Sequence, residues 1–468
     1  MKRSTGQPLW ISILIAGALI ASGCAKSAAA PAAVATSASA STTTSAPAAP
    51  TTAPAALVET TASTASTAGA VTTAGAVTIK PATTTDVVTA FPTLGPPTGS
   101  QIVLGLVNTE GTPGLDFPEM RLNIAGAIDY LNQHGGLGGR PIKLETCIAK
   151  GSPETSQACA QEMVGKKAEM VLFGVDLFPD YATYTAGGIP VVGVLPILAP
   201  DYTANALFLT GGNATLGGAM AAVAKDHFHA KTVGIIGSDN PGSNSSAASL
   251  IAALDVAGLA HTIVKGGDNE TDAGYQGLMR AAAKGNPDLL VSLYSDAGCI
   301  GAIRGRAALK ITIPVLTTGI CSSKKVLDVV GDDALGWTFT GVQAQQETPA
   351  LAILKDILAP VMKVPPAKID SASLGLGALA LFEIMSLAVY ANMIQAQAKP
   401  VTGASVFAFL GSTKGLKLWP GQGSIDCGTA PKYPSICSFT FPFAEYQAGG
   451  KVVTIPGLEA VSSRDYLP

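Results

Sequence analysis

The sequence predicts an α/β protein of two lobes, each a doubly wound parallel sheet, preceded by a disordered N-terminal tether. Short apolar runs alternate with helical stretches from residue 101 onward, which is typical of buried parallel strands covered by helices on both faces. This alternation occurs twice in series, which indicates two lobes. Before it, residues 25–100 consist almost entirely of Ala, Thr, Ser, Pro, Val and Gly, which cannot form a packed core.

Length and composition exclude several classes of protein. The chain has 468 residues, of which 47% are apolar and 13% are charged, with a formal net charge of −3. Nucleic-acid binding is not expected, because phosphate recognition needs clustered Lys and Arg. After the first two dozen residues we find no apolar run of about 20, so a multi-span membrane protein is not expected either.

The N-terminus has the organisation of an export signal. Lys2 and Arg3 precede a mostly apolar run, Leu9–Ala21, and the small residues that end it lead directly to Cys24. The sequence Ala-Ser-Gly-Cys resembles a bacterial lipobox, in which the thiol receives a diacylglycerol, although Ala21 stands where that pattern prefers Leu. We predict a signal peptide at residues 1–23 and lipidation of Cys24; the alternative is an ordinary secretory signal.

Residues 24–100 are predicted to be a disordered tether. The charged residues from 25 to 100 are Lys26, Glu59, Lys80 and Asp86, and the sole aromatic residue is Phe91. A flexible coil of this length has an end-to-end distance of roughly 50 Å. The tether would hold the folded body near the membrane; a neutral spacer without a tuned length is the alternative.

The first series of elements begins at residue 101. Strands are predicted at Ile102–Val107, Ile142–Cys147, Met170–Gly174 and Ile189–Val194. Helices are predicted at Pro118–His134, where the apolar residues have a 3.6-residue period, and at Pro153–Lys166.

The second series repeats this pattern. Strands are predicted at Val233–Gly237, Thr262–Val264, Leu289–Tyr294 and Pro314–Thr317, and helices at Asn244–Ala257, Gly274–Lys284 and Ala297–Ala308. A long helical stretch from Ser371 to about Ala398 and a strand region from about Trp419 follow.

We interpret this order as a chain that returns to the first lobe before it ends in the second. Lobe 1 is predicted to comprise residues 101–213 and 344–438, and lobe 2 residues 214–343 and 439–468. The three crossovers are expected near Gly212–Thr215, Thr340–Gln346 and Ser438–Phe443.

A motif between the first predicted helix and the second strand points to a family. Residues Asn132–Leu144 read NQHGGLGGRPIKL. Glycines here can end a helix with positive φ and allow a tight reversal into the strand. The pattern resembles the type I periplasmic binding proteins, in particular the Leu/Ile/Val- and amide-binding proteins that feed ABC importers, over residues 101 to about 445. The resemblance implies the type I periplasmic binding protein fold.

Cysteine usage suits an exported protein. Seven cysteines less the predicted lipidated one leave six, which allow 15 pairings. Their positions relative to the predicted elements favour local pairs, namely Cys147–Cys159, Cys299–Cys321 and Cys427–Cys437. A zinc site is not expected, because no CxxC pair occurs.

Catalytic and cofactor motifs are not evident. His227 and His229 could form a metal pair, but they end a predicted helix, where they more simply complement its dipole. Ser322–Lys325 fits S-x-x-K, yet it opens a predicted helix, so a serine N-cap is the simpler interpretation. We therefore expect no enzyme activity, no metal and no cofactor.

The ligand is expected beyond the carboxyl ends of the strands and between the lobes. The candidate loops are 108–117, 176–180, 195–196, 239–242, 294–296 and 317–319. The candidate ligand-binding residues are Thr109, Phe117, Asp176, Phe178, Leu195, Pro241, Tyr294, Asp296 and Thr318.

The resemblance also implies how an amino acid would bind, and this chain departs from that pattern. In the family, hydroxyls after the third and fourth strands bind the ligand carboxylate, but loops 174–180 and 194–198 contain none. Gly319 stands near the expected acid for the ammonium group, and Pro241 replaces a tyrosine. Because Asp176 and Asp180 add negative charge, we expect leucine, isoleucine and valine to bind poorly. A less polar or positively charged compound stacked on Tyr294 should bind better.

The resemblance and the N-terminus together predict a lipid-anchored, extracytoplasmic solute-binding protein. It would capture a small molecule between its lobes and deliver it to the permease of an ABC importer of the branched-chain amino acid or amide type. We expect a monomer that binds no nucleic acid. The alternative is a membrane-tethered sensory module without a role in transport.

Overall fold

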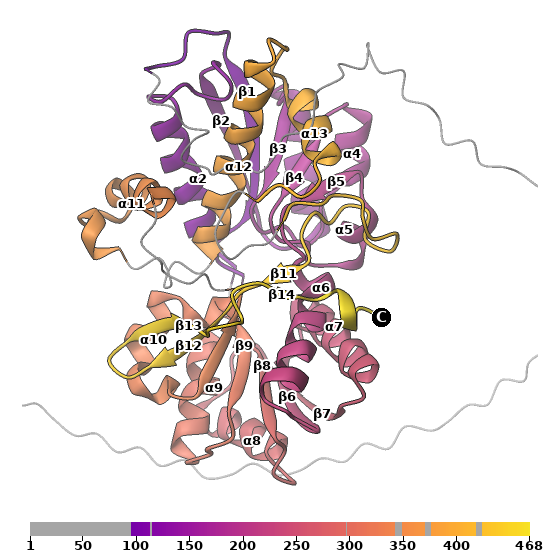
Figure 1. Ribbon diagram of the computed structural model, residues 1–468, viewed down its shortest axis with the longest axis vertical. Helices are drawn as coiled ribbons and strands as arrows, with labels where there is room; N and C mark the ends of the chain where they lie inside the picture. The colour runs from indigo at the N-terminus through magenta and orange to yellow at the C-terminus, as the bar shows by residue number, and fades with distance from the viewer. Residues whose placement is uncertain (1–94, 113–114, 296, 342–348, 370–375, 418–423) are drawn as a thin grey trace, which may run out of the picture. The chain divides into compact units, whose positions relative to one another are not determined.

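The computed structural model describes residues 95–112, 115–295, 297–341, 349–369, 376–417 and 424–468 (Figure 1). The predicted signal peptide, Cys24, nearly all of the predicted tether and the candidate Asp296 lie outside these ranges.

The first sheet is parallel throughout and has the strand order β2-β1-β3-β4-β5. Its strands are β1 (Ile102–Thr109), β2 (Ile142–Ala149), β3 (Met170–Phe173), β4 (Val191–Gly193) and β5 (Ala206–Phe208). The helices of this part are α2 (Pro118–Leu131), α3 (Pro153–Gly165), α4 (Tyr181–Ala186), α5 (Ala199–Thr203), α11 (Pro349–Met362), α12 (Leu376–Ala396) and α13 (Gly403–Ser412), with a 3-10 turn, η4, at Pro366–Lys368. We call this part lobe 1.

The second sheet has seven strands in the order β13-β12-β10-β9-β8-β6-β7. The parallel strands are β6 (Thr232–Ser238), β7 (Ala260–Gly266), β8 (Leu289–Leu293), β9 (Val315–Thr318) and β10 (Trp337–Thr340). The antiparallel hairpin β12 (Phe443–Gln447) and β13 (Lys451–Thr454) extends the sheet beyond β10. The helices are α6 (Gly212–Ala222), α7 (Pro241–Ala257), α8 (Asp272–Ala282), α9 (Ala297–Ala308) and α10 (Lys324–Val330), with short π or 3-10 segments η1 (Val223–His227), η2 (Gly319–Ser322) and η3 (Gly331–Ala334). We call this part lobe 2.

The glycine motif reverses the chain between α2 and β2, as its sequence predicts. Gly135 and Gly136 follow the helix with φ of 95° and 62°, values that a residue with a Cβ rarely adopts. The side chain of Asn132 then bonds to both backbone groups of Ile142, at 2.7 and 2.9 Å. Arg140 forms an ion pair with Glu169, which ties the turn to the start of β3. These contacts give the Asn, Gly and Arg of the motif a structural role.

Several elements escaped the sequence prediction, and each has a physical reason. α6 consists mostly of small or apolar residues buried on all sides, so it shows no amphipathic period. β5 and β10 have only three and four residues. The start of the strand region predicted from about Trp419 lies outside the described residues, and the first strand described after it is β11 (Thr440–Phe441).

α12 corrects the expectation that no long apolar run follows the N-terminus. Leu376–Ala396 is the one helix in the described parts of the chain that is long and apolar enough to cross a membrane. It is largely buried and packs against α2 and α13, so its apolar surface serves the core of lobe 1. Burial also holds the pKa of its one acid, Glu383, well above the usual range.

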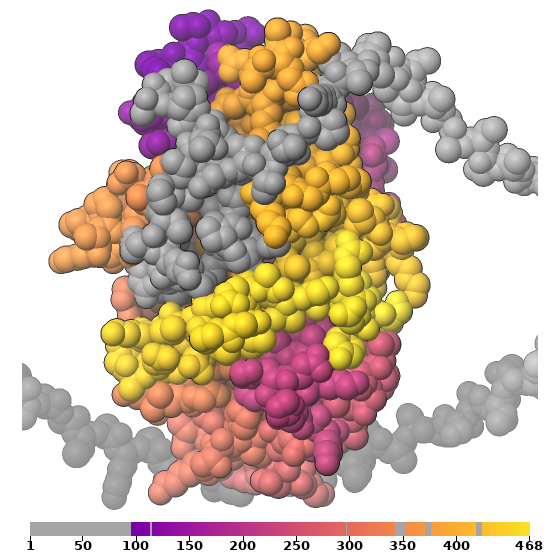
Figure 2. Space-filling view, viewed as in Figure 1, coloured from indigo at the N-terminus to yellow at the C-terminus, as the bar shows by residue number. Residues whose placement is uncertain are grey.

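The last residues of the chain lie over the boundary between the two lobes. β11 pairs with β14 (Val461–Ser462), and the 3-10 turn η6 (Arg464–Tyr466) packs on α6. In Figure 2 the C-terminal residues form a yellow band between elements of the first lobe and elements of the second.

Among the described residues, three disulfides are present, and they are the pairs expected from the sequence: Cys147–Cys159, Cys299–Cys321 and Cys427–Cys437. Each joins segments that are close in sequence, with separations of 12, 22 and 10 residues. None of them joins β1–β5 to β6–β10.

Candidate functional site

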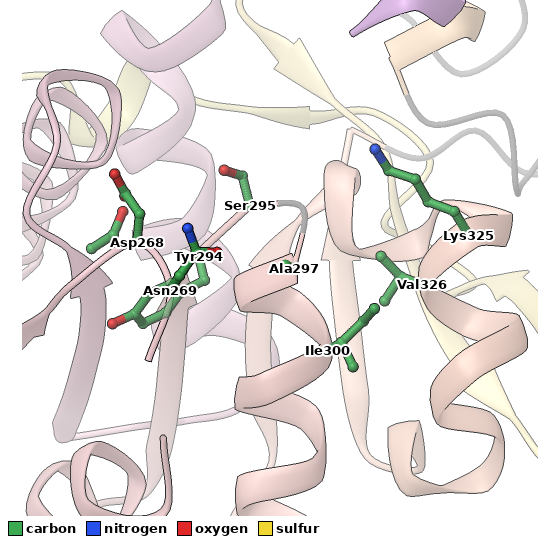
Figure 3. A pocket seen from close by; sticks show the side chains of 9 residues that line it. Asp268, Asn269, Tyr294, Ser295, Ala297, Ile300, Lys325 and Val326 are labelled. Atoms are coloured by element: carbon green, nitrogen blue, oxygen red, sulfur yellow. The ribbon is translucent and has the colours of Figure 1, made fainter. Parts of the chain in front are cut away.

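A pocket of about 250 Å³ opens in lobe 2 where its central strands end (Figure 3). Ser238 closes β6, and Tyr294 and Ser295 follow β8. Asp268 and Asn269 come from the loop between β7 and α8. The remaining lining residues are Ala297 and Ile300 on α9 and Lys325 and Val326 on α10.

The parallel register explains why these residues meet. Gly237 pairs with both Leu293 and Lys265, so the ends of β6, β7 and β8 share one edge of the sheet. In an open α/β sheet this carboxyl edge is where ligands bind. The pocket has an apolar wall at Ile300 and Val326 and polar groups around it, a composition typical of small-molecule sites.

Asp268 is held at one side of the pocket by the cap of α7. Its Oδ1 accepts a hydrogen bond of 2.6 Å from Asn240 Nδ2, which also donates to Ser238 Oγ at 2.7 Å. Asn240 Oδ1 in turn accepts from Ser243 N at 2.8 Å and caps the helix. A capping residue fixed by the helix therefore positions an exposed carboxylate at the mouth of the pocket.

Tyr294 forms part of the pocket wall, but its ring is only 1% exposed. The ring packs edge-on against Tyr275, with 5.3 Å between the ring centroids. Burial raises the pKa of its hydroxyl, and Tyr275, Glu270 and Asp268 add to the effect. The sequence predicted a ligand stacked on this ring; here its faces are covered, so stacking would require the ring to move.

The Cys299–Cys321 disulfide clamps the two segments that form the apolar side of the pocket. Cys299 lies on α9 and Cys321 lies just before α10, and both are fully buried. Their sulfur atoms lie 3.5 and 3.4 Å from the carbonyl oxygen of Tyr294. The disulfide thus joins α9 to the segment that leads to Lys325.

At the corresponding edge of lobe 1, two acids have partners within the fold. Asp176 is 5% exposed, and its Oδ1 accepts from Ser156 Oγ at 2.5 Å and Phe178 N at 3.2 Å. Burial raises the pKa of Asp176. Asp180 caps α4 by accepting from Thr183 N at 3.1 Å, and the bonds from Thr183 lower its pKa. Both acids thus bond within lobe 1, although Oδ2 of Asp176 is buried without a hydrogen-bond partner among the described residues.

The other candidates in lobe 1 belong to the core or its margin. Phe117 is buried at the start of α2, and Phe178 and Leu195 are partly buried against the same hydrophobic core. Thr109 ends β1 fully buried, and its hydroxyl has no hydrogen-bond partner among the described residues. None of them lines the pocket described above.

In lobe 2, Pro241 is the exposed first residue of α7. Thr318 ends β9, and its hydroxyl is buried without a hydrogen-bond partner in the described parts of the chain. Neither lines the pocket, so Tyr294 is the one predicted contact that does. Asp296 lies outside the described residues.

The motifs set aside in the sequence have structural positions. His227 is the last residue of η1, as a helix-ending residue should be. Ser323 occupies the N-cap position of α10, but its side chain makes no capping bond, which corrects the expected role. Within the described ranges, no group of three or more His, Cys, Asp or Glu residues could hold a metal ion.

A family model described as periplasmic binding protein matches residues 100–429, which is most of the chain. The chain belongs to this family. Comparison with curated proteins gives no match.

Solved structures of periplasmic binding proteins share the fold at low sequence identity. An ABC transporter substrate-binding protein from Sphaerobacter thermophilus has 16% identity and a TM-score of 0.60, over 76% of this chain and 96% of that one. A solute binding protein of an ABC transporter from R. palustris, in complex with 4-hydroxybenzoate, has 17% identity and a TM-score of 0.56, over 76% and 95%. The branched-chain amino acid transporter substrate binding protein from Streptococcus pneumoniae, in complex with isoleucine, has 16% and 0.55, over 76% and 99%.

For this periplasmic binding protein, the sequence missed most of the pocket lining. Asp268 and Asn269 follow Gly266 and Gly267 at the end of β7, and that glycine pair marks a loop at the carboxyl edge. Lys325 and Val326 follow a short 3-10 turn after β9, so their distance from the strand hid them.

Proposed function

We propose that this chain is the extracytoplasmic substrate-binding component of an ABC importer and that it closes its two lobes over a small molecule. The observation that carries the proposal is the pocket at the carboxyl edge of β6 and β8, in a chain of the periplasmic binding protein family. The solved structures with the same fold include binders of an amino acid and of an aromatic acid, which makes a small organic ligand the natural class.

The hydrogen bonds between the two lobes are compatible with a hinge. Ser245 on α7 donates to the carbonyl oxygen of Ile197 in lobe 1 at 2.6 Å, and its hydroxyl oxygen lies 2.9 Å from that of Tyr202 on α5. Asn213, at the start of α6, donates to the same carbonyl oxygen of Ile197 at 3.4 Å. Such a small set of polar contacts can rearrange when a ligand binds. The ligand shifts the equilibrium toward the closed form if it binds that form more tightly than the open form.

Anchoring through Cys24 forms part of the proposal. A lipid on this cysteine, followed by the predicted tether, would keep the binding lobes close to the membrane that holds the permease. We expect Cys24→Ser to move the protein from the membrane fraction to the soluble extracytoplasmic fraction. A Cys24→Ser protein that stays with the membrane would contradict the anchor and leave the binding function untouched.

The binding function is tested by a thermal-shift screen with amino acids, amides, short acids, amines and aromatic compounds, followed by calorimetry. We expect at least one class to raise the melting temperature, since a ligand that binds the native state stabilises it. If no class does so, the proposed capture of a small molecule fails. Uptake of the bound compound by cells with and without the gene separates transport from sensing.

A further inference from the structure

We infer that the pocket in lobe 2 holds a positively charged nitrogen of its ligand at Asp268, so that the ligand is an amine with an apolar body. This inference rests on the proposed binding function and names the ligand's chemical class. Its basis is the distribution of charge and apolar surface around the pocket.

The side of the pocket formed by the loops after β6 and β7 is acidic. The residues 239–243 and 265–272 contain four acids, Asp239, Asp268, Glu270 and Asp272, against one base, Lys265. Lys265 Nζ bonds at 2.5 Å to Asn244 Oδ1, on the outer side of α7. Glu270 Oε1 accepts from Gly267 N at 2.6 Å, so that carboxylate holds its own loop. Asp268 is the acid among them that lines the pocket.

The geometry at Asp268 leaves part of its carboxylate for a ligand. Oδ1 accepts from Asn240, and no hydrogen bond of Oδ2 to another described residue is found. A carboxylate has about four lone-pair sites, so it can hold its helix cap and a ligand cation together. Because Asn240 is itself fixed by Ser243 N, the carboxylate is positioned before any ligand arrives.

The opposite side suits an apolar body. Ile300 and Val326 form an apolar surface there beside the base Lys325, and Figure 3 shows these three residues across the pocket from Asp268. A ligand with a cationic end at Asp268 would place its hydrocarbon part against these two residues. Asp176 and Asp180 of lobe 1 do not line this pocket.

Calorimetry with three compounds that share one ring tests the charge directly: 4-hydroxybenzylamine, 4-hydroxybenzyl alcohol and 4-hydroxybenzoate. Isoleucine is added as a fourth probe because it carries an ammonium group on an aliphatic body. We expect the amine to bind about tenfold more tightly than the alcohol, and the acid more weakly still, since a charged hydrogen bond is stronger than a neutral one.

Two substitutions separate direct contact from general charge. Asp268→Asn should weaken amine binding about tenfold. Asp272→Asn removes the same charge at an exposed position outside the pocket, and it should change the affinity less than twofold. If both variants lose affinity equally, the ligand responds to the summed negative charge of the loops after β6 and β7, and a direct contact at Asp268 is refuted.

The remaining outcomes are also decisive. Failure of both ammonium-bearing probes to bind at millimolar concentration would overturn the inference. Tight binding of 4-hydroxybenzoate that Asp268→Asn leaves intact would overturn it while supporting the proposed binding function. Isoleucine binding that Asp268→Asn abolishes would support the cation site.

Discussion

The carboxyl edges of the two sheets carry similar residues but use them differently. In lobe 1, Asp180 and Asp201 bond through both carboxylate oxygens to neighbouring backbone and hydroxyl groups, and Asp176 is buried with Oδ1 bonded to Ser156 and Phe178 N. In lobe 2, Asp268 makes one bond to a helix cap and otherwise faces an open pocket. An acid at the carboxyl edge of a strand is therefore available to a ligand only when hydrogen-bond donors of its own lobe do not already occupy its carboxylate.

The largest expected effect concerns the rigidity of the lobe 2 edge. Replacing both Cys299 and Cys321 by Ala should lower the free energy of unfolding by about 3 kcal/mol on the loop-entropy model. Because the disulfide joins the two segments that form the apolar side of the pocket, ligand affinity should also fall. Chemical denaturation with calorimetry measures both quantities.

Replacing both Cys147 and Cys159 by Ala is the matched control in lobe 1. That disulfide closes a loop of 12 residues, so its loss of stability should be similar. Ligand affinity should be retained, because neither cysteine is near the lobe 2 pocket. Equal losses of affinity in both variants would break the contrast between the two edges.

The second effect is a pH dependence that arises in lobe 1. Asp201 is 1% exposed, and burial raises its pKa from 3.8 to about 6, although Tyr181 and the backbone of Leu198 and Ile197 bond to it. A raised pKa means that the native state binds the proton more tightly than the unfolded chain does. Its contribution to stability is therefore present below pH 4 and is lost as the pH rises through 6.

We expect the Asp201 contribution to amount to about 3 kcal/mol. In Asp201→Asn, the unfolding free energy should change less between pH 4 and pH 7 than it does in the wild type, because an amide can accept from Ile197 N without ionising. Denaturation curves at several pH values measure it. An unchanged slope would show that Asp201 is not the titrating group.

The third effect concerns amino acids as ligands. Isoleucine should bind more weakly than 2-methylbutylamine, the same molecule without its carboxylate, by about tenfold. Loops 174–180 and 194–198 of lobe 1 offer no hydroxyl to a carboxylate. Competition calorimetry compares the two compounds, and micromolar binding of isoleucine alone would contradict the expectation.

Much of the fold follows from the sequence, but the site does so only in part. Apolar runs and amphipathic helical stretches alternate along the sequence, so most strands and helices can be predicted from it. The turn within Asn132–Leu144 also follows from neighbouring residues, because Asn132 bonds to the backbone of Ile142. The fate of an acid depends on distant partners: Ser156 for Asp176, and Asn240 for Asp268. Sequence reasoning placed Asp176 and Asn240 in candidate loops, but it missed the loop that carries Asp268, and it could not tell which acid was already bonded.

The smallest effect tests the comparison at a single helix end. Asp180→Ala should cost about 1 kcal/mol of stability, since it removes the cap of α4 and leaves Thr183 N without its acceptor. Asp268→Asn should cost almost nothing, because the amide oxygen can still accept from Asn240.

The pKa of Asp180 is lowered by Thr183, so its contribution to stability is present above the ordinary pKa and is lost as the pH falls below it. Thermal denaturation at pH 7 and pH 3 should therefore show a difference between wild type and Asp180→Ala at pH 7 that shrinks at pH 3. If Asp268→Asn instead proved the more destabilising change, Asp268 would be a structural acid like those of lobe 1, and the distinction between the two edges would collapse.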